Sequence, residues 1–313
     1  LADTGSLPEG KLEQIKEMCR RNAKPFEYAF LLDALKDERS QGITIDTARC
    51  FFNTEKRKYI VIDAPGHIEF LKNMITGASR ADAALLVIDA AEGVQENSRR
   101  HGYMLSMLGI RQVCVLVNKM DLVNYDRTVF EQVKKEYGEF LAQIGITPEG
   151  YIPVSGMQGD NIALRSDALS GKQNMPWYDG PIVLETLDQF IATAPPLSLP
   201  FRMPVQDVYK FTAKGDDRRI IAGTVETGIL SAGDELVFYP SGKKTGVKRI
   251  EPMKSDEEQG IAEAGYATGF TMTEQIYIRR GELCTKADEP APLVGNLLKV
   301  NIFWLGSAPM TDG

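Results

Sequence analysis

The stretch that decides the fold is Arg111-Gln112-Val113-Cys114-Val115-Leu116-Val117-Asn118-Lys119-Met120-Asp121. Its middle is an unbroken apolar run, which predicts a buried strand over residues 111–117. A strand that is apolar at successive positions is typical of a parallel sheet covered by helices on both faces. The polar residues that follow then lie at the carboxyl end of a strand, where open α/β sheets bind their ligands.

Segments typical of strands and of helices alternate on both sides of this stretch. Gly109 and Gly145 each follow a helical pattern, as glycines that end helices do. Strands separated by helices predict an α/β domain with a parallel sheet. We expect strands over residues 58–63, 81–89 and 151–154, and helices over residues 70–79, 97–108 and 127–144.

The pattern changes near Ala194-Pro195-Pro196. Beyond it, short runs typical of strands are separated by glycines, which predicts a small all-β barrel. A further run at residues 297–304 predicts the start of a third β domain. We expect an α/β domain over 1–194, a β-barrel over 195–293 and a truncated β domain over 294–313. The barrel strands are expected at residues 203–209, 220–226, 235–239, 246–250 and 267–272.

Composition narrows the class of protein. The chain has 36 basic and 43 acidic residues and a net charge of −7, which argues against a nucleic-acid-coating protein but leaves room for a local basic patch. Its longest purely apolar run, residues 83–88, is far too short to span a membrane. Four cysteines (Cys19, Cys50, Cys114 and Cys284) lack metal-binding spacing and fit a reducing cytoplasm. We therefore expect a cytoplasmic protein without a membrane or nucleic-acid partner.

The turn Asn118-Lys119-Met120-Asp121 has the chemistry to bind guanine. A carboxylate at Asp121 can accept hydrogen bonds from guanine N1–H and from the exocyclic amine, whereas adenine offers neither donor there. Asn118 can bond guanine N7, and the stem of Lys119 can lie over the base. The alternative is an ordinary solvated turn, but the preceding buried strand favours a site.

The turn Asp63-Ala64-Pro65-Gly66-His67 follows the strand predicted at residues 58–63. Asp63 can hold Mg²⁺ through water, and the Gly66 N–H can approach a γ-phosphate because no side chain blocks it. His67 can orient an attacking water. Such a turn is common by itself, but it precedes Asn118 with a strand leading into each, which favours a nucleotide site.

Two further segments add candidate residues. Thr44 can give its hydroxyl to Mg²⁺ and its N–H to a γ-phosphate, although a simple turn into a strand is the alternative. Ser155-Gly156-Met157 follows the last predicted strand of the α/β domain. Small residues there let backbone N–H groups reach guanine O6, but a Ser-Gly pair by itself has little specificity.

A phosphate-binding loop of the pattern Gly-x-x-x-x-Gly-Lys-Ser/Thr is missing from these 313 residues. The nearest match runs from Gly5 to Leu12, where a leucine replaces the hydroxyl residue and no strand precedes the loop. We interpret it as a decoy. The chain should therefore bind GTP poorly, because the N–H groups and the lysine around the β-phosphate are absent.

The motifs, in this order, resemble the translation-factor class of GTPases. Residues 38–46 are similar to its switch I, and residues 63–67 with 70–78 resemble its switch II and following helix. The resemblance extends to residues 223–228 and 233–236 of the β-barrel. It implies binding of GTP or GDP with Mg²⁺. The implied roles are Mg²⁺ binding by Thr44 and Asp63, γ-phosphate sensing by Gly66, water positioning by His67, gating by Ile43, and guanine recognition by Asn118, Lys119, Asp121 and Ser155.

Within that class, several details resemble the GTPase subunit of bacterial sulfate adenylyltransferase, the CysN type. They are Arg99-Arg100-His101 and residues 174–178, 238–243 and 303–310. This resemblance implies a small catalytic partner subunit, in a heterodimer or larger complex, that makes adenosine 5′-phosphosulfate from ATP and sulfate while this subunit hydrolyses GTP. It also implies that a phosphate loop normally precedes the segment that residues 1–5 resemble.

Three alternatives to this assignment stay open. The first is an elongation factor that delivers aminoacyl-tRNA, because residues 175–178 are shared with elongation factor 1-alpha. The second is a scaffold with the fold but without hydrolysis. The third is a sulfate-activating protein that continues into a fused adenylylsulfate kinase.

Overall fold

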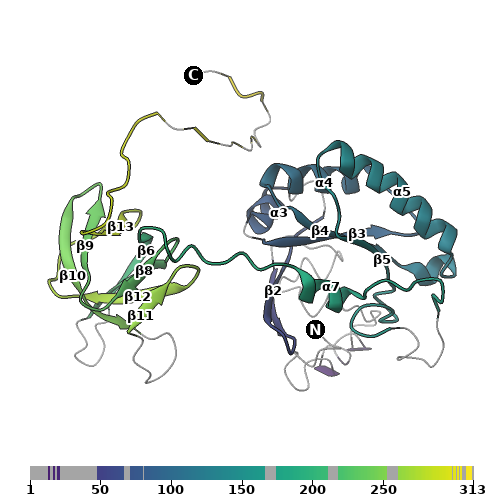
Figure 1. Cartoon of the computed structure of the whole chain (residues 1–313), viewed down its shortest axis with the longest axis horizontal. Coiled ribbons are helices and arrows are strands. Elements are labelled where there is room, and N and C mark those ends of the chain that lie inside the picture. The colour runs from purple at the N-terminus through teal and green to yellow at the C-terminus, as the bar shows by residue number, and fades with distance from the viewer. Residues whose placement is uncertain are drawn as a thin grey trace. The chain divides into compact units, whose positions relative to one another are not determined.

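The computed structural model describes residues 48–66, 71–79, 81–165, 174–210, 218–251 and 260–297, and the separate positions 13, 14, 17, 20, 21, 299, 300, 302, 304 and 308–311. The chain divides into two compact units, Leu1–Ala192 and Thr193–Gly313 (Figure 1). The domain boundary expected at residue 194 lies beside this division. No helix within these described ranges has both the length and the apolarity needed to cross a bilayer.

The first unit is built on a parallel sheet of order β3-β4-β5. Its strands are Ala83–Asp89, Gln112–Asn118 and Gly150–Pro153, close to the predicted ranges. Alternate residues of β4 enter different cores, as the two-residue period of a strand requires. Val113, Val115 and Val117 pack with residues of α4 (Glu96–Leu108) and α5 (Arg127–Gln143). Cys114 and Leu116 pack with α7 (Val183–Gln189).

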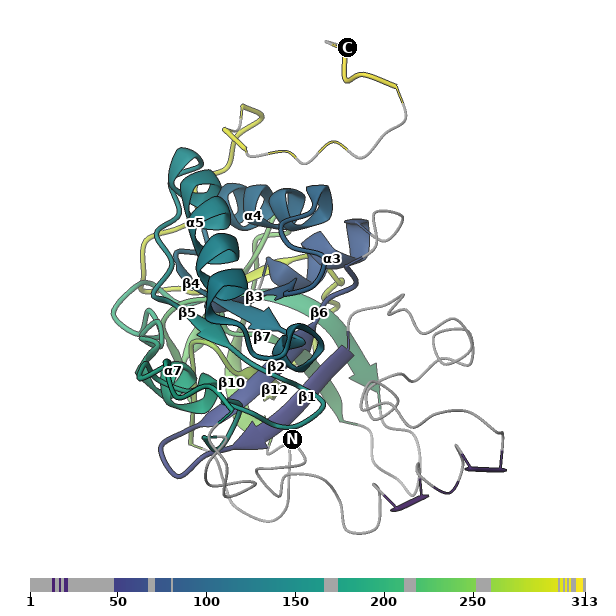
Figure 2. The ribbon, with the colours of Figure 1, turned by 90° about the vertical axis from the view of Figure 1, so that its right-hand side faces the viewer.

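The helices α3 (Leu71–Ala78), α4 and α5 lie where the sequence predicts helices, whereas α7 was not predicted. Figure 2 shows α3, α4 and α5 on one side of the sheet and α7 on the other. Gly109 ends α4 with a φ of 77°, and Gly145 follows α5 with a φ of 74°. Both lie in the left-handed region that glycine adopts without strain. A short 3₁₀ helix, Met120–Val123, follows β4.

The strand predicted at residues 58–63 forms, but it does not join the parallel sheet. It is β2 (Lys58–Asp63), which pairs antiparallel with β1 (Ala48–Asn53). Asp188 anchors this hairpin to α7 by accepting hydrogen bonds from Thr54 and Tyr59 at 2.9 and 2.5 Å. Among the described strands β2 therefore lies outside the parallel sheet, because nothing described pairs with the second edges of β2 and β3.

The second unit is an all-β barrel, as predicted. Six strands close it in the order β10-β12-β7-β6-β13-β9, and the short strands β8 and β11 pair beside it. Phe201, Met203, Phe238 and Phe270 have no exposed surface and form the middle of its core. The strands are Arg202–Lys210, Arg219–Thr224, Ile229–Ser231, Glu235–Tyr239, Lys243–Glu251, Ile261–Glu263, Ala267–Met272 and Leu283–Lys286, from β6 to β13.

The extra strand expected at residues 297–304 is not found among the described residues of that range. Leu297 is 92% exposed and Trp304 is 55% exposed. A strand needs a neighbour for its backbone groups, and nothing described pairs with this segment.

Candidate functional site

Loops at the carboxyl edge of the parallel sheet bring the predicted base-binding residues together. Asp89 and Asn118 are register partners at the ends of β3 and β4. The backbone joins the loops, because the Ala90 N–H donates to the Asn118 carbonyl at 2.8 Å and the Met120 N–H donates to the Val154 carbonyl at 3.2 Å. Residues 118–121 and 155–157 therefore share one edge of the sheet.

Asn118 ties the loop after β5 to the loop after β4. Its Oδ1 accepts a hydrogen bond from the Gly156 N–H at 3.0 Å. A Cβ at position 156 would lie 3.4 Å from that oxygen, which is an ordinary van der Waals contact, so the tether uses the backbone of residue 156 and does not depend on a glycine there. Asn118 thus tethers the two loops that carry the predicted base-binding residues.

Lys119 projects from a left-handed turn, with a φ of 62°. Its ammonium pairs with Asp89 Oδ2 at 2.7 Å, and Asp89 Oδ1 accepts the N–H groups of Ala91 and Glu92. Burial by itself would raise the pKa of Asp89, but the hydrogen bonds from Lys119 and from the backbone lower it. The hydrogen bond to Asp89 in turn raises the pKa of Lys119. The lysine stem is therefore held at the site by an ion pair.

Asp121 is oriented by a fully buried serine. The Ser155 hydroxyl donates to Asp121 Oδ1 at 2.6 Å, and the Gln158 N–H donates to the same hydroxyl at 3.3 Å. This arrangement fixes the carboxylate before any base arrives, which reduces the cost of ordering it on binding. Sequence reasoning gave Ser155 only a backbone contact to guanine, whereas its side chain positions the key carboxylate.

The other residues of these two loops have different surroundings. Met120 is fully buried in the hydrophobic core under α5, so it supports the turn from below. Met157 is 61% exposed beside Gly156. These two methionines therefore enclose the base-binding loops without adding polar groups.

The second predicted motif lies at the end of β2. Asp63 and Ala64 are half-buried, Pro65 is buried and Gly66 is exposed. One side chain from elsewhere in the chain approaches it, because Nε2 of His101 on α4 lies 3.2 Å from the Gly66 carbonyl oxygen. Burial lowers the pKa of His101, and the hydrogen bond to Gly66 opposes that shift only in part. The ring is thus neutral near pH 7 and donates Nε2–H to the carbonyl.

His101 is a site residue that sequence reasoning missed. In the sequence, His101 stands out only as part of the resemblance to a family. Its contact with Gly66 joins residues 35 positions apart, and no pattern of spacing along the chain predicts such a contact. The remaining predicted residues, Ile43, Thr44 and His67, lie outside the described residues. The structure thus brings the base-binding residues together and leaves the γ-phosphate, water and Mg²⁺ contacts as predictions.

Thiol chemistry has little support in the described part of the chain. No group of three or more His, Cys, Asp or Glu side chains within it is placed to hold a metal. Cys114 and Cys284 are buried free thiols, and burial raises the pKa of Cys114 to about 12 and that of Cys284 further. These thiols are therefore protonated packing residues.

Comparison with known proteins independently supports a GTP-binding domain in this chain. A family model described as the elongation factor Tu GTP binding domain matches residues 4–196. The chain is 40% identical over 287 residues to sulfate adenylyltransferase subunit 1 of Laribacter hongkongensis, covering 92% of this chain and 57% of that protein. It is 42% identical over 299 residues to elongation factor 1-alpha of Methanocaldococcus jannaschii, covering 93% and 67%.

Among solved structures, the GTPase-like domain of S. cerevisiae Ski7, bound to GDP and inorganic phosphate, matches with a TM-score of 0.65 at 16% identity, over 92% of this chain and 71% of that one. At this identity the likeness shows the fold alone. The family model, by contrast, covers more than half of the chain, and the base-binding loops lie inside the matched range. The chain therefore belongs to the translation-factor family of GTPases, whose GTP-binding domain it contains.

Proposed function

We propose that this chain is part of the GTP-hydrolysing subunit of a sulfate adenylyltransferase. GTP hydrolysis would be coupled to synthesis of adenosine 5′-phosphosulfate from ATP and sulfate by a separate, smaller catalytic subunit. The observation that carries GTP binding is the preorganised Asp121, held by Ser155 beside Asn118. The assignment to sulfate activation draws on the 40% identity to subunit 1 of that enzyme.

Guanine recognition follows from the charges at this edge. An Asp121 carboxylate held by one oxygen presents acceptors to the N1–H and exocyclic amine of guanine. Adenine would leave the carboxylate unpaired in a partly buried place, which costs about 1–3 kcal/mol. Lys119, fixed by Asp89, lies beside the base position as an apolar stem with a paired end.

The γ-phosphate end would be sensed by Gly66. Gly66 is exposed, which leaves room for an anion, and His101 holds the Gly66 carbonyl by a hydrogen bond. Loss of the γ-phosphate would release this turn, which is how switch loops respond to hydrolysis. His101 is thus a positioning residue that ties the switch to α4.

Mg²⁺ suits the donor set at the end of β2. Asp63 is a half-buried carboxylate, and within the described chain it is not part of a cluster of three or more metal-binding side chains. Mg²⁺ keeps most of its water ligands and takes only one or two carboxylates from a protein, so a single carboxylate is enough for it. When bound, the cation would neutralise charge on the phosphates. By resemblance, Asp63 and Thr44 would hold it, His67 would orient the attacking water, and Ile43 would limit access of that water to the phosphate.

A translation elongation factor is the second candidate function, favoured by the 42% identity to elongation factor 1-alpha. The net charge of −7 leans against a protein that carries RNA. Both candidates use the same guanine site, so only the partner separates them.

One experiment distinguishes the two functions. GTP turnover of the full-length protein containing this chain is measured with the sulfate-activating subunit plus ATP and sulfate, and separately with ribosomes plus aminoacyl-tRNA. We expect a several-fold increase only in the first mixture, because coupling between sites is a shared free energy. Stimulation only by ribosomes would leave the elongation factor as the function.

A further inference from the structure

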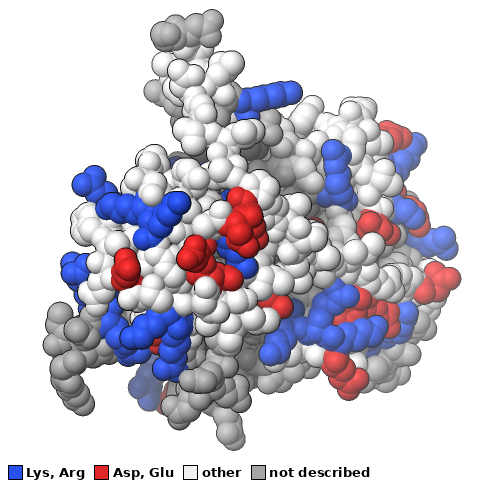
Figure 3. Space-filling model, turned by 60° about the vertical axis from the view of Figure 1, so that its left-hand side comes forward, with Lys and Arg blue, Asp and Glu red and all other residues white. Residues whose placement is uncertain are grey.

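A second concentration of charge lies on the barrel. A hollow of about 230 Å³ is lined by four basic residues, one acidic residue and three others, and we call it the basic pocket. Figure 3 shows one face of the molecule, on which basic side chains lie in groups. The lining residues are Arg218, Arg219, Lys248, Arg249, Glu251, Thr271, Met272 and Gln275.

Three neighbouring strands build the basic pocket. Strands β10, β12 and β7 lie side by side, and Arg249 and Ile220 are both register partners of Thr271. The register of β10 shifts between Val247 and Arg249, which marks a bulge. A regular strand turns consecutive side chains to opposite faces, but here Lys248 and Arg249 are both exposed. The bulge therefore brings two cations to one surface.

The charges in the basic pocket do not balance. Glu251 is its only carboxylate, with a side chain 11% exposed, and it pairs with Arg218 at 2.9 Å. Its other oxygen accepts the Thr271 hydroxyl at 3.3 Å. No ion pair of Arg219, Lys248 or Arg249 is present within the described residues. Four cations against one carboxylate leave three positive charges in a hollow of a chain whose net charge is −7.

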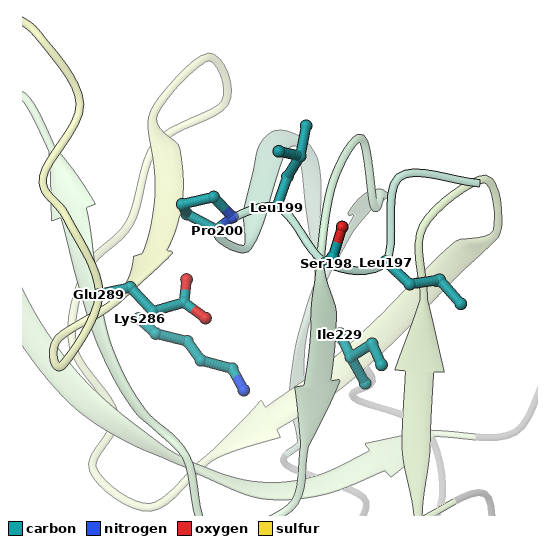
Figure 4. Close-up of a pocket in the computed structure, with 7 residues that line it drawn as sticks. All are labelled: Leu197, Ser198, Leu199, Pro200, Ile229, Lys286 and Glu289. Atoms are coloured by element: carbon teal, nitrogen blue, oxygen red, sulfur yellow. The ribbon is translucent and has the colours of Figure 1, made fainter. Parts of the chain in front are cut away.

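A second hollow, drawn in Figure 4, has charges that are paired within the barrel. It measures about 300 Å³, and its two charged residues, Lys286 and Glu289, lie together on one side. Lys286 pairs with Asp234 at 2.8 Å, and the Glu289 carboxylate accepts the Phe201 N–H at 2.5 Å. Its two charged residues are thus occupied by contacts within the barrel, whereas Arg219, Lys248 and Arg249 of the basic pocket have no ion-pair partner among the described residues.

We propose that the basic pocket binds a tetrahedral oxyanion group, phosphate or sulfate, either free or as part of a small organic ester. Guanidinium groups offer paired N–H donors that match such oxygens, and a lysine adds a compact charge. The anion would relieve the repulsion among the cations around the hollow. A volume below that of sites for drug-sized ligands fits a single oxyanion group.

The test measures the binding of radiolabelled sulfate and phosphate by equilibrium dialysis, with this chain and with two double variants. Lys248→Ala with Arg249→Ala removes two charges from the basic pocket. Lys244→Ala with Arg280→Ala removes two exposed charges from the same barrel outside the pocket, so its net charge is matched. We expect the first double variant to lose at least tenfold in affinity and the second to change less than twofold.

Further dialysis arms identify the source of the oxyanion. Adenosine 5′-monophosphate binding more tightly than inorganic phosphate, with no binding of adenosine, supports an ester. Equal or tighter binding of the free anion supports an inorganic ligand. Equal loss in both double variants, or no saturable binding of any anion, overturns the proposal.

Discussion

The two units differ in whether the edges of their described strands are paired. Each of the six barrel strands has two neighbours, so the barrel closes on itself. In the first unit β2 pairs only with β1, and β3 only with β4, among the described strands. Apolar side chains show at these edges, with Ile60 60% exposed and Val87 57% exposed. A closed barrel needs no further strand, whereas such edges are places where another strand can pair.

The comparison also separates stability from nucleotide binding. The aromatic core of the barrel is completely buried, and none of the predicted guanine or phosphate residues lies in the barrel. The first unit places its polar groups at strand ends and loops, where they face a ligand. We therefore expect variants of the barrel core to change unfolding, and variants of the loops of the first unit to change guanine-nucleotide binding and hydrolysis.

The largest effect should come from the barrel core. Phe270 has no exposed surface, so Phe270→Ala should lower the free energy of unfolding by about 3–5 kcal/mol. Val87→Ala, at an open edge, should cost less than about 0.5 kcal/mol. Urea unfolding followed by hydrogen exchange reads each unit separately. Equal costs for the two variants would show that the edge of β3 is as well packed as the barrel.

Guanine selectivity tests the other side of the comparison. In the full-length protein, Asp121→Asn should weaken the binding of GTP by about 2 kcal/mol, because the guanine donors lose their acceptor. It should favour XTP, since the amide can donate to the xanthine oxygen. Competition among GTP, XTP and ATP measures this. The matched Asp288→Asn, at an exposed carboxylate of the barrel outside both proposed sites, is the control, and its nucleotide preference should equal that of the wild type. Unchanged GTP affinity in Asp121→Asn would remove the base site.

Hydrolysis should depend on His67 more than binding does. His67→Ala should reduce GTP turnover by about 10²-fold in the full-length protein, with little change in GTP affinity, because a water-positioning group acts in the transition state. Single-turnover hydrolysis and equilibrium binding give the two values. A wild-type rate in this variant would make His67 an ordinary loop residue.

Burial made much of this molecule predictable. Strand β4 is fully buried at Val113, Cys114, Val115 and Val117. Its apolar run therefore allowed both the strand and the start of the base-binding turn to be predicted from the sequence. The helices α4 and α5 bury one face each, so their spacing was equally clear. The closed barrel was predictable from glycine-separated runs for the same reason.

Features that depend on contacts across the chain were not predictable. Strand β1 went unpredicted, and its residue Phe51 is 67% exposed, so burial gave it no clear pattern. Helix α7 is only seven residues long and is fixed to the hairpin through Asp188. The bulge at Lys248 depends on how β10 meets β12, which spacing along one strand does not record.

The smallest expected effect concerns His101, which joins α4 to the turn after β2. Burial lowers its pKa in the folded state, so the unfolded chain binds the proton more readily. Stability is then full above the ordinary histidine pKa of about 6.5 and falls as the pH drops below it. His101→Gln keeps a donor for the Gly66 carbonyl but cannot titrate, so it should flatten this part of the pH profile of unfolding in the first unit. Hydrogen exchange of the first unit between pH 7.5 and 5 measures the slope, and the barrel is the internal control because the described barrel contains no histidine. An unchanged slope in His101→Gln would mean that burial beside Gly66 does not lower the pKa of His101 in the folded state.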